Sequence, residues 1–342
     1  MLLEVILFLV GLVLLYFGAE ALVDGASGIA LKFGVKPLVV GLTVVAFGTS
    51  SPELLVCLTA AIEHTDATDS ISIGNIIGSN IANIALILGC ASLVRPIKVT
   101  EQAVRREYPL MLAASFLLLG LILFDKTLWG ADRYMLTRWD GAILAGGMVA
   151  YLLYSYMTSL YGDSNEEPAV TEELEEVDPD AVARDPMSKQ IVRIVLGIAA
   201  LAGGAYLMVE SSVEIARYFE VPDLVIGISI VALGTSLPEL ATSLVAALND
   251  ASDISVGNVI GSNLFNILLV LGTVSLIAPI HVQDHVLNFD IWMMLAVALL
   301  IFPILQTGDR ISRTEGVAML LVYGGYIFFL FYRSSPTVTG AV

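Results

Sequence analysis

The stretch VVGLTVVAFGTSSPELLV, residues 39–56, decides the fold of this chain. It belongs to an apolar run long enough to cross a membrane, yet it places Gly48, Pro52 and Glu53 in its middle. Residues 225–242, VIGISIVALGTSLPELAT, repeat nearly the same pattern. A proline interrupts helical hydrogen bonding, and a carboxylate inside a bilayer is costly. Because both features occur twice, they predict a functional site inside the membrane.

The composition is that of a membrane protein. Of the 342 residues, 57% are hydrophobic and only 14% are charged, and the mean hydropathy is +0.86. The first apolar segment follows Met1 directly, without the basic residues that precede a cleavable signal peptide. Cys57 and Cys90 both fall in apolar runs, so we expect no disulfide. We expect a lipid bilayer as the surroundings, and no nucleic acid, cofactor or obligate protein partner.

The apolar segments predict an all-α polytopic membrane protein with ten transmembrane helices. The expected spans are 2–23, 37–62, 71–94, 107–124, 140–161, 190–215, 222–248, 254–278, 288–305 and 315–332. Residues 162–189 hold ten Asp or Glu and three Pro, which predicts an acidic linker. The expected organisation is a first five-helix repeat at 1–161, the linker at 162–189, a second five-helix repeat at 190–333 and a tail at 334–342.

An internal repeat relates the two groups of five spans. Six residues recur 186 positions later: Gly41, Gly48, Thr49, Ser50, Pro52 and Glu53 match Gly227, Gly234, Thr235, Ser236, Pro238 and Glu239. Further on, GNIIGSNIANIALILG (74–89) matches GNVIGSNLFNILLVLG (257–272), 183 positions later. Because each half has an odd number of spans, we expect the second half to be inverted relative to the first. Inverted repeats are typical of secondary transporters, whose sites form between the repeats on broken helices.

The basic residues of the loops predict the orientation in the membrane. If the N-terminus lies outside, eleven Lys or Arg fall on the cytoplasmic side and five on the outer side. We therefore expect both termini outside and the linker, residues 162–189, in the cytoplasm.

Each broken segment offers oxygen atoms to a cation. Pro52 leaves the carbonyl of Gly48 without its usual helical donor, and Pro238 does the same in the second half. A carboxylate, Glu53 or Glu239, follows each proline directly, and no intramembrane Lys or Arg lies near enough in the sequence to pair with it. Free carbonyls and carboxylates in hydrocarbon need a partner, and both Na⁺ and Ca²⁺ bind oxygen.

The next span of each half adds polar side chains at helical spacing. They are Asn75, Ser79 and Asn83 in the first half and Asn258, Ser262 and Asn266 in the second. For Asn75 and Asn258, helix packing or capping is an alternative to a role in the site. Two ionised carboxylates balance one Ca²⁺ or two Na⁺, and unpaired they would be a strong burden in the bilayer. Such a site should rarely stand empty, which favours obligatory exchange over a channel.

The motifs GTSSPEL with GSNIAN, and GTSLPEL with GSNLFN, resemble the two α-repeats of the cation/Ca²⁺ exchanger superfamily, and closely those of prokaryotic Na⁺/Ca²⁺ exchangers. The resemblance covers the whole ten-span plan, with the repeats at 41–89 and 227–272, and implies the plasma membrane of a prokaryote. It implies that Glu53 and Glu239 are the central Ca²⁺ ligands. Backbone oxygens at Thr49 and Thr235 would join them. The resemblance further implies flanking Na⁺ sites at Ala46, Ser50, Ser79, Ala232, Ser236 and Ser262. The last polar position of the site in each half falls on Asn83 and on Asn266.

These features favour a sodium/calcium antiporter that exports Ca²⁺ in exchange for Na⁺ by alternating access, and a transporter rather than an enzyme. A Ca²⁺/H⁺ antiporter with the same glutamates as proton carriers is the alternative, and the retained Ser and Thr hydroxyls argue against it. A K⁺-dependent exchanger is a third possibility. Several relatives of that kind carry Asp where this chain has Asn266, so K⁺ co-transport is disfavoured.

The first and sixth spans are expected to be the most mobile part of the molecule. They occupy matching places in the two halves, and both contain glycines that ease the sliding of packed helices. These are Gly11, Gly18 and Gly25 in the first span and Gly197, Gly203 and Gly204 in the sixth.

Overall fold

The computed structural model describes residues 2–33, 35–63, 66–128, 134–161, 186–219, 232–284, 286–307 and 310–334. These residues are almost wholly helical, with four strands of two residues each. Most of the predicted linker, residues 162–185, and nearly all of the predicted tail, residues 335–342, lie outside the described residues.

The first half starts with the long helix α1 (Leu2–Phe33). Its other helices, where η marks a π-helix, are α2 (Pro37–Val40), η1 (Gly41–Val45), α3 (Ala46–Thr49), α4 (Ser51–Glu63), α5 (Asp66–Ile81), η2 (Ala82–Ile87), α6 (Leu88–Val94), η3 (Ala103–Glu107), α7 (Tyr108–Leu128) and α8 (Arg138–Tyr161). Its strands are β1 (Ile97–Lys98) and β2 (Met135–Leu136).

The second half starts with the equally long helix α10 (Met187–Tyr218). Its other helices are α12 (Ala232–Gly234), α13 (Leu237–Leu248), α14 (Ser252–Leu264), η5 (Phe265–Leu271), α15 (Gly272–Ile277), η6 (Val286–Asp290), α16 (Ile291–Thr307) and α17 (Arg313–Ser334). Its strands are β3 (Ile280–His281) and β4 (Arg310–Ile311). The same order of long helix, broken segment, π-containing span and two outer helices thus occurs in each half.

Eight helices of the described residues are long and apolar enough to cross a membrane. A ninth candidate is the pair Pro37–Thr49 and Ser51–Ile62, which bends by 45° at its break. The remaining predicted span, 222–248, is the seventh in the chain; it is described only from residue 232, and its helix α13 is short. The chain is therefore a multi-pass helical membrane protein in which eight to nine of the ten predicted spans meet these criteria.

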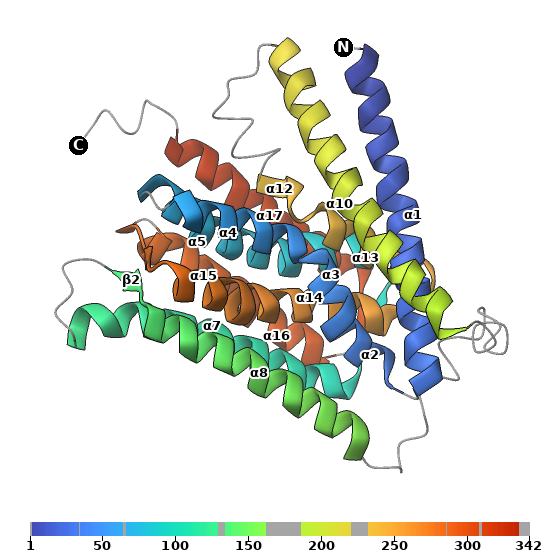
Figure 1. The fold of residues 1–342 in the computed structure, drawn as a ribbon, viewed down its shortest axis with the longest axis horizontal. Coiled ribbons are helices and arrows are strands. Elements are labelled where there is room, and N and C mark those ends of the chain that lie inside the picture. Colours follow the sequence, from blue (N-terminus) through green and yellow to red (C-terminus); the bar gives the residue numbers. More distant parts are fainter. Residues whose placement is uncertain are drawn as a thin grey trace.

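The helices α1 and α10 pack against each other along an antiparallel glycine seam and stand out from the rest of the molecule (Figure 1). A Cβ atom on Gly11 would lie 2.8 Å from the carbonyl oxygen of Gly204, and one on Gly204 would lie 2.8 Å from that of Gly11. Gly18 and Gly197 make an equivalent close approach further along the seam. Only glycine allows backbones to come this near, but the seam depends on the six predicted glycines only in part: Gly203 meets nothing within 4 Å among the described residues.

Two boundaries differ from those that the sequence predicts. The sequence predicts that the first span ends at residue 23, but α1 continues to Phe33. Gly25 and Gly28 allow this because they bring the end of α1 against Gln190 of α10. The helix α10 begins at Met187, so the last three residues of the predicted linker are helical.

The strands and helix caps also match between the halves. Strand β1 pairs with β4, and β2 pairs with β3, each antiparallel. Thr137 and Asp140 form the cap of α8, with the Asp140 carboxylate accepting the backbone N–H of Thr137 at 2.7 Å. Ser312 and Glu315 form the same cap on α17, also at 2.7 Å. These reciprocal caps satisfy backbone donors at the two helix starts, where helical hydrogen bonds are not available.

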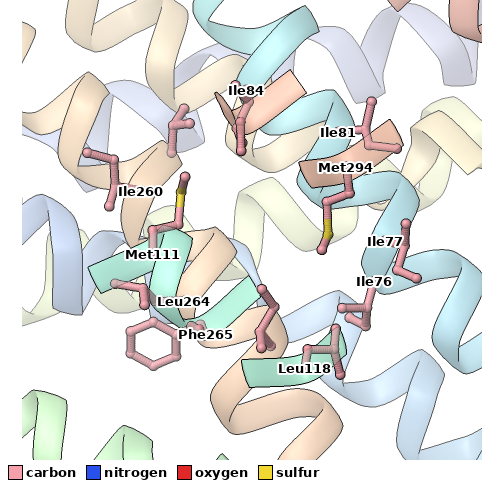
Figure 2. Close-up of a cluster of buried hydrophobic side chains, with 14 of the residues drawn as sticks. Ile76, Ile77, Ile81, Ile84, Met111, Leu118, Ile260, Leu264, Phe265 and Met294 are labelled. Atoms are coloured by element: carbon pink, nitrogen blue, oxygen red, sulfur yellow. The ribbon is translucent and has the colours of Figure 1, made fainter. Parts of the chain in front are cut away.

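The centre of the molecule is formed by the two spans Ser72–Val94 and Ser252–Ile277. In the most apolar stretch of each span, 78% of the residues are buried inside the protein, against 22% in Leu2–Phe33. Around them packs one large core in which Ile76, Ile77, Ile81 and Ile84 meet side chains of α7, α14 and α16 (Figure 2). Polar groups on these two spans are therefore held at the centre, away from lipid and water.

We predict that Gly197→Ala destabilises the protein by about 1–3 kcal/mol, the usual cost of overpacking. The added Cβ would meet the Gly18 oxygen and the Leu22 nitrogen, both at 2.8 Å, and these backbone atoms cannot turn aside. Gly203→Ala, on the same helix, is the matched control and should be neutral or slightly stabilising. Thermal unfolding of the detergent-purified protein, followed by tryptophan fluorescence, measures both. Equal shifts for the two variants would contradict the seam.

Candidate ion-binding site

The broken segments end one helix and begin another at matching places. Ser50 (φ −84°, ψ 5°) separates α3 from α4, and Ser236 (φ −87°, ψ 2°) precedes α13. Pro52 and Pro238 then lie in the first turn of the new helices, where the missing N–H costs no helical hydrogen bond. The prolines thus act as helix starters after a break, which refines their expected role as breakers within one continuous span.

The two glutamates follow these prolines and lie in the first turns of α4 and α13. Both side chains are fully buried, at 0% exposure. Glu239 accepts a hydrogen bond from Ser50 at 2.9 Å and a longer one from Ser262 at 3.5 Å, both on Oε1. Glu239 Oε2 and both carboxylate oxygens of Glu53 lack a hydrogen bond of good geometry among the described residues, although the hydroxyls of Thr235 and Ser79 lie beside Glu53. A helix N-terminus favours negative charge, but it does not neutralise two buried carboxylates.

The two threonines of the motifs reach across to the other half. Thr49 donates its hydroxyl to Asn258 Oδ1 at 3.1 Å, and Thr235 donates to Asn75 Oδ1 at 3.2 Å. Asn75 and Asn258, for which helix packing was the alternative role, therefore each accept a hydrogen bond from the threonine of the opposite repeat. With their hydroxyls so engaged, the threonines are held in one orientation beside the break.

Asn83 and Asn266 are fully buried and arranged alike. Asn83 Nδ2 donates to Asn263 Oδ1 at 3.1 Å, and Asn266 Nδ2 donates to Asn80 Oδ1 at 3.0 Å. The Oδ1 atom of each is buried with no donor among the described residues. Each of the two residues is the second of a π-helical segment, η2 or η5, and π-helical turns are frequent at functional sites.

Of the remaining predicted site residues, the structure describes the serines and Ala46, but not the side chain of Ala232. Ser236 donates to Ser79 at 3.4 Å, and Ser262 lies 3.5 Å from the Thr49 hydroxyl, so these hydroxyls gather around the glutamates. Ala46 is buried in α3, and its carbonyl accepts the Ser50 N–H at 2.9 Å. Ala232 begins α12, but its side chain lies outside the described residues, as does Gly227 of the second motif.

The elements bring these residues into one region. The π-helix η2, which carries Asn83, packs against α13 with Glu239, and η5, which carries Asn266, packs against α4 with Glu53. The unpartnered atoms of this region are all oxygens: Glu53 Oε1 and Oε2, Glu239 Oε2, Asn83 Oδ1 and Asn266 Oδ1. Buried acceptors without donors are costly, whereas carboxylate and amide oxygens are ligands that hard cations prefer. The arrangement can therefore bind a cation.

Sequence reasoning did not single out Asn80 and Asn263. Both are buried to 1% exposure and hold the side chains of Asn266 and Asn83. They belong to the two GSN triplets and recur 183 positions apart, so the internal repeat already contained the signal. They lie off the polar face that helical spacing defines in each of the two spans.

The comparisons with known proteins agree with this geometry. Residues 3–157 and 189–332 match the model of the sodium/calcium exchanger protein family. The chain is 35% identical over 347 residues to the sodium/calcium exchanger MaX1 of Methanosarcina acetivorans, covering 96% of this chain and 98% of that protein. It is 38% identical over 340 residues to the inner membrane protein YrbG of Escherichia coli, covering 98% and 99%. Among solved structures, the sodium-calcium exchanger NCX_Mj superposes with a TM-score of 0.76 at 30% identity, covering 96% of this chain and 99% of that one.

The fold and the paired motifs define a multi-pass cation exchanger. The chain belongs to the sodium/calcium exchanger family, as the resemblance of its repeats suggested. Several of its relatives are named as ion exchangers, which supports the expectation of a transporter rather than an enzyme.

We predict that Thr49→Val lowers the stability of the protein by about 1–3 kcal/mol, the cost of leaving a buried acceptor without its donor. The change keeps the shape of the side chain but removes the hydrogen bond to Asn258. Thr59→Val is the matched control, because the exposed Thr59 hydroxyl only bonds the Leu55 carbonyl of its own helix. Thermal unfolding in detergent without Na⁺ or Ca²⁺ compares the two. A loss of similar size in both would mean that the cross-repeat bond is not stabilising.

Proposed function

We propose that this protein is a sodium/calcium antiporter that exports Ca²⁺ in exchange for Na⁺ at a site centred on Glu53 and Glu239. The observation that carries the proposal is the set of buried oxygens without donors, three from the two carboxylates and two from Asn83 and Asn266. Two carboxylates balance the charge of one Ca²⁺ or of two Na⁺, so either load would make the buried site neutral. An unloaded site would hold two repelling charges, which favours exchange over a leak.

The proposed ligands are divided between a central and two flanking positions. Glu53 and Glu239, with the backbone oxygens of Thr49 and Thr235, would hold Ca²⁺. The hydroxyls and carbonyls around them would hold Na⁺, which needs fewer and weaker ligands; these residues are Ala46, Ser50, Ser79, Ala232, Ser236 and Ser262. Asn83 and Asn266 would complete the site as neutral amide ligands. Their neutrality keeps the negative charge at two, which disfavours co-transport of a further K⁺.

We further infer a ten-span topology with an inverted second half, both termini outside and residues 162–185 in the cytoplasm of a prokaryotic plasma membrane. The antiparallel packing of α1 and α10 supports inversion, because the two helices start the two halves. The reciprocal strand pairs and caps support it as well. The α1–α10 pair packs on the centre mainly through α2 and α13, which suits a unit that moves against a fixed core.

A Ca²⁺/H⁺ antiporter remains the competing function, since protonation would also neutralise the glutamates. The hydroxyls favour Na⁺: Ser50, Ser79, Ser236 and Ser262 all lie beside the carboxylates or each other. A proton carrier needs only the carboxylate, and it gains nothing from such a set of neutral oxygen ligands.

We predict that an outward Na⁺ gradient drives Ca²⁺ uptake into proteoliposomes and that an equal outward H⁺ gradient does not. Glu53→Gln and Glu239→Gln should each abolish uptake, because one remaining carboxylate cannot balance Ca²⁺. Glu107→Gln is the matched control: Glu107 is also buried, but its carboxylate accepts hydrogen bonds from Tyr151 at 3.2 Å and Gln102 at 3.4 Å, neither of which belongs to a motif. If more than two Na⁺ exchange for each Ca²⁺, an applied potential adds about 2.3 kcal/mol per charge per 100 mV to the driving force.

Two outcomes would redirect the proposal. Uptake driven only by H⁺ would keep the two-glutamate site but change the coupling ion. Uptake that survives in both glutamine variants would overturn the site itself.

A further inference from the structure

Two asparagines outside the proposed ligand set occupy equivalent places in the two halves. Asn263 of α14 accepts the side-chain N–H of Asn83 from the first half at 3.1 Å. Asn80 of α5 accepts the side-chain N–H of Asn266 from the second half at 3.0 Å. All four side chains are buried to 1% exposure or less. Each proposed amide ligand is thus held by an asparagine from the opposite repeat.

An amide ligand has an orientation that matters. Its oxygen and nitrogen ends have nearly the same shape, but only the oxygen can bind a cation, and the N–H₂ end repels it. The hydrogen bond to Asn263 uses the nitrogen of Asn83, so the oxygen faces the other way, where it has no donor among the described residues. The same holds for Asn266 with Asn80. A rotation of the amide by half a turn would place two oxygens against each other.

Two methionines set the orientation of the holding asparagines in turn. Asn263 Nδ2 lies 3.3 Å from Met111 Sδ of α7, and Asn80 Nδ2 lies 3.8 Å from Met294 Sδ of α16. A thioether accepts a weak hydrogen bond and donates none, so it favours the nitrogen end of the amide. Figure 2 shows both sulfur atoms within the apolar core formed by α5, α7, α14 and α16. In these surroundings the sulfur is the polar contact that distinguishes one end of the amide from the other.

We propose that Asn80 and Asn263 are positioning residues that turn the oxygens of Asn266 and Asn83 toward the transported cation. The proposal rests on the proposed function, because it assigns these oxygens to the Ca²⁺ site. Met294 and Met111 complete two equivalent series, Met111–Asn263–Asn83 and Met294–Asn80–Asn266. Each series crosses from one repeat to the other, so the ligands of each half depend on the packing of both.

The test is a double-mutant cycle on Ca²⁺ affinity. Asn263→Leu removes the acceptor while nearly preserving the volume, and Asn83→Asp supplies a ligand that presents an oxygen in either orientation. The four proteins are the wild type, N263L, N83D and N83D/N263L. Ca²⁺ binding to the purified proteins is measured by calorimetry. The KM and maximal rate of Na⁺-driven Ca²⁺ uptake are measured in proteoliposomes.

N263L is expected to raise the Kd and KM for Ca²⁺ by about tenfold, the effect of losing one correctly turned ligand at about 1.4 kcal/mol. In the N83D background the same substitution should change them by less than about twofold or lower them, because the carboxylate introduced at position 83 would oppose the Asn263 oxygen. If N263L raises the Kd and KM in the wild type but not in N83D, Asn263 acts by orienting the amide of Asn83. A role in helix packing alone would give the same change in both backgrounds, which would overturn the proposal.

The mirrored cycle, N80L with N266D, carries the same expectation and decides the question if N263L does not fold. Met111→Leu should give a smaller rise in KM in the same direction. An unchanged Kd in both N263L and N80L, in a protein whose Ca²⁺ binding is lost in Glu53→Gln, would overturn the positioning role alone. A wild-type protein that neither binds nor exchanges Ca²⁺ would instead overturn the proposed function.

Discussion

The structure depends on two carboxyl groups, those of Glu53 and Glu239, that are fully buried at its centre. Both side chains are at 0% exposure, and three of their four oxygens lack a hydrogen bond of good geometry among the described residues. An ion of this kind in a low-dielectric interior destabilises a fold by several kcal/mol unless it is paired. The chain retains two of them, and the breaks, the hydroxyls and the amides around them all supply oxygen. Under the proposed function, a bound cation would supply the positive charge that balances these carboxylates.

The internal repeat explains how such a site is assembled from short segments. A single motif supplies one carboxylate and a few neutral oxygens, which is too little to bind Ca²⁺. The second motif supplies the same set, and the polar groups of one half bond those of the other: Thr49 with Asn258, and Thr235 with Asn75. The residues of the proposed site thus also hold the two halves together. A substitution that weakens ion binding there is therefore expected to weaken the contact between the halves as well.

Much of the helical fold could be predicted from the sequence, and so could the residues at the centre of the candidate site. Apolar length located the spans, and the recurrence of Gly48, Pro52 and Glu53 located the breaks. Helical spacing predicts which residues share a face of their own helix, but not which residue of another helix they meet. For this reason the partners of Asn83 and Asn266 were not predicted, although Asn80 and Asn263 were visible in the repeat. The end of α1 was placed too early for a similar reason, because its last turns are held by Gln190 of a distant helix.

The two glutamates have different hydrogen bonds although their surroundings match in sequence. Ser50 donates to Glu239 at 2.9 Å, whereas its equivalent, Ser236, donates to Ser79, and the hydroxyls beside Glu53 are those of Thr235 and Ser79. Under the proposed exchange, a cation that satisfies both carboxylates would remove the difference between them, and the loaded site could then open to either side of the membrane.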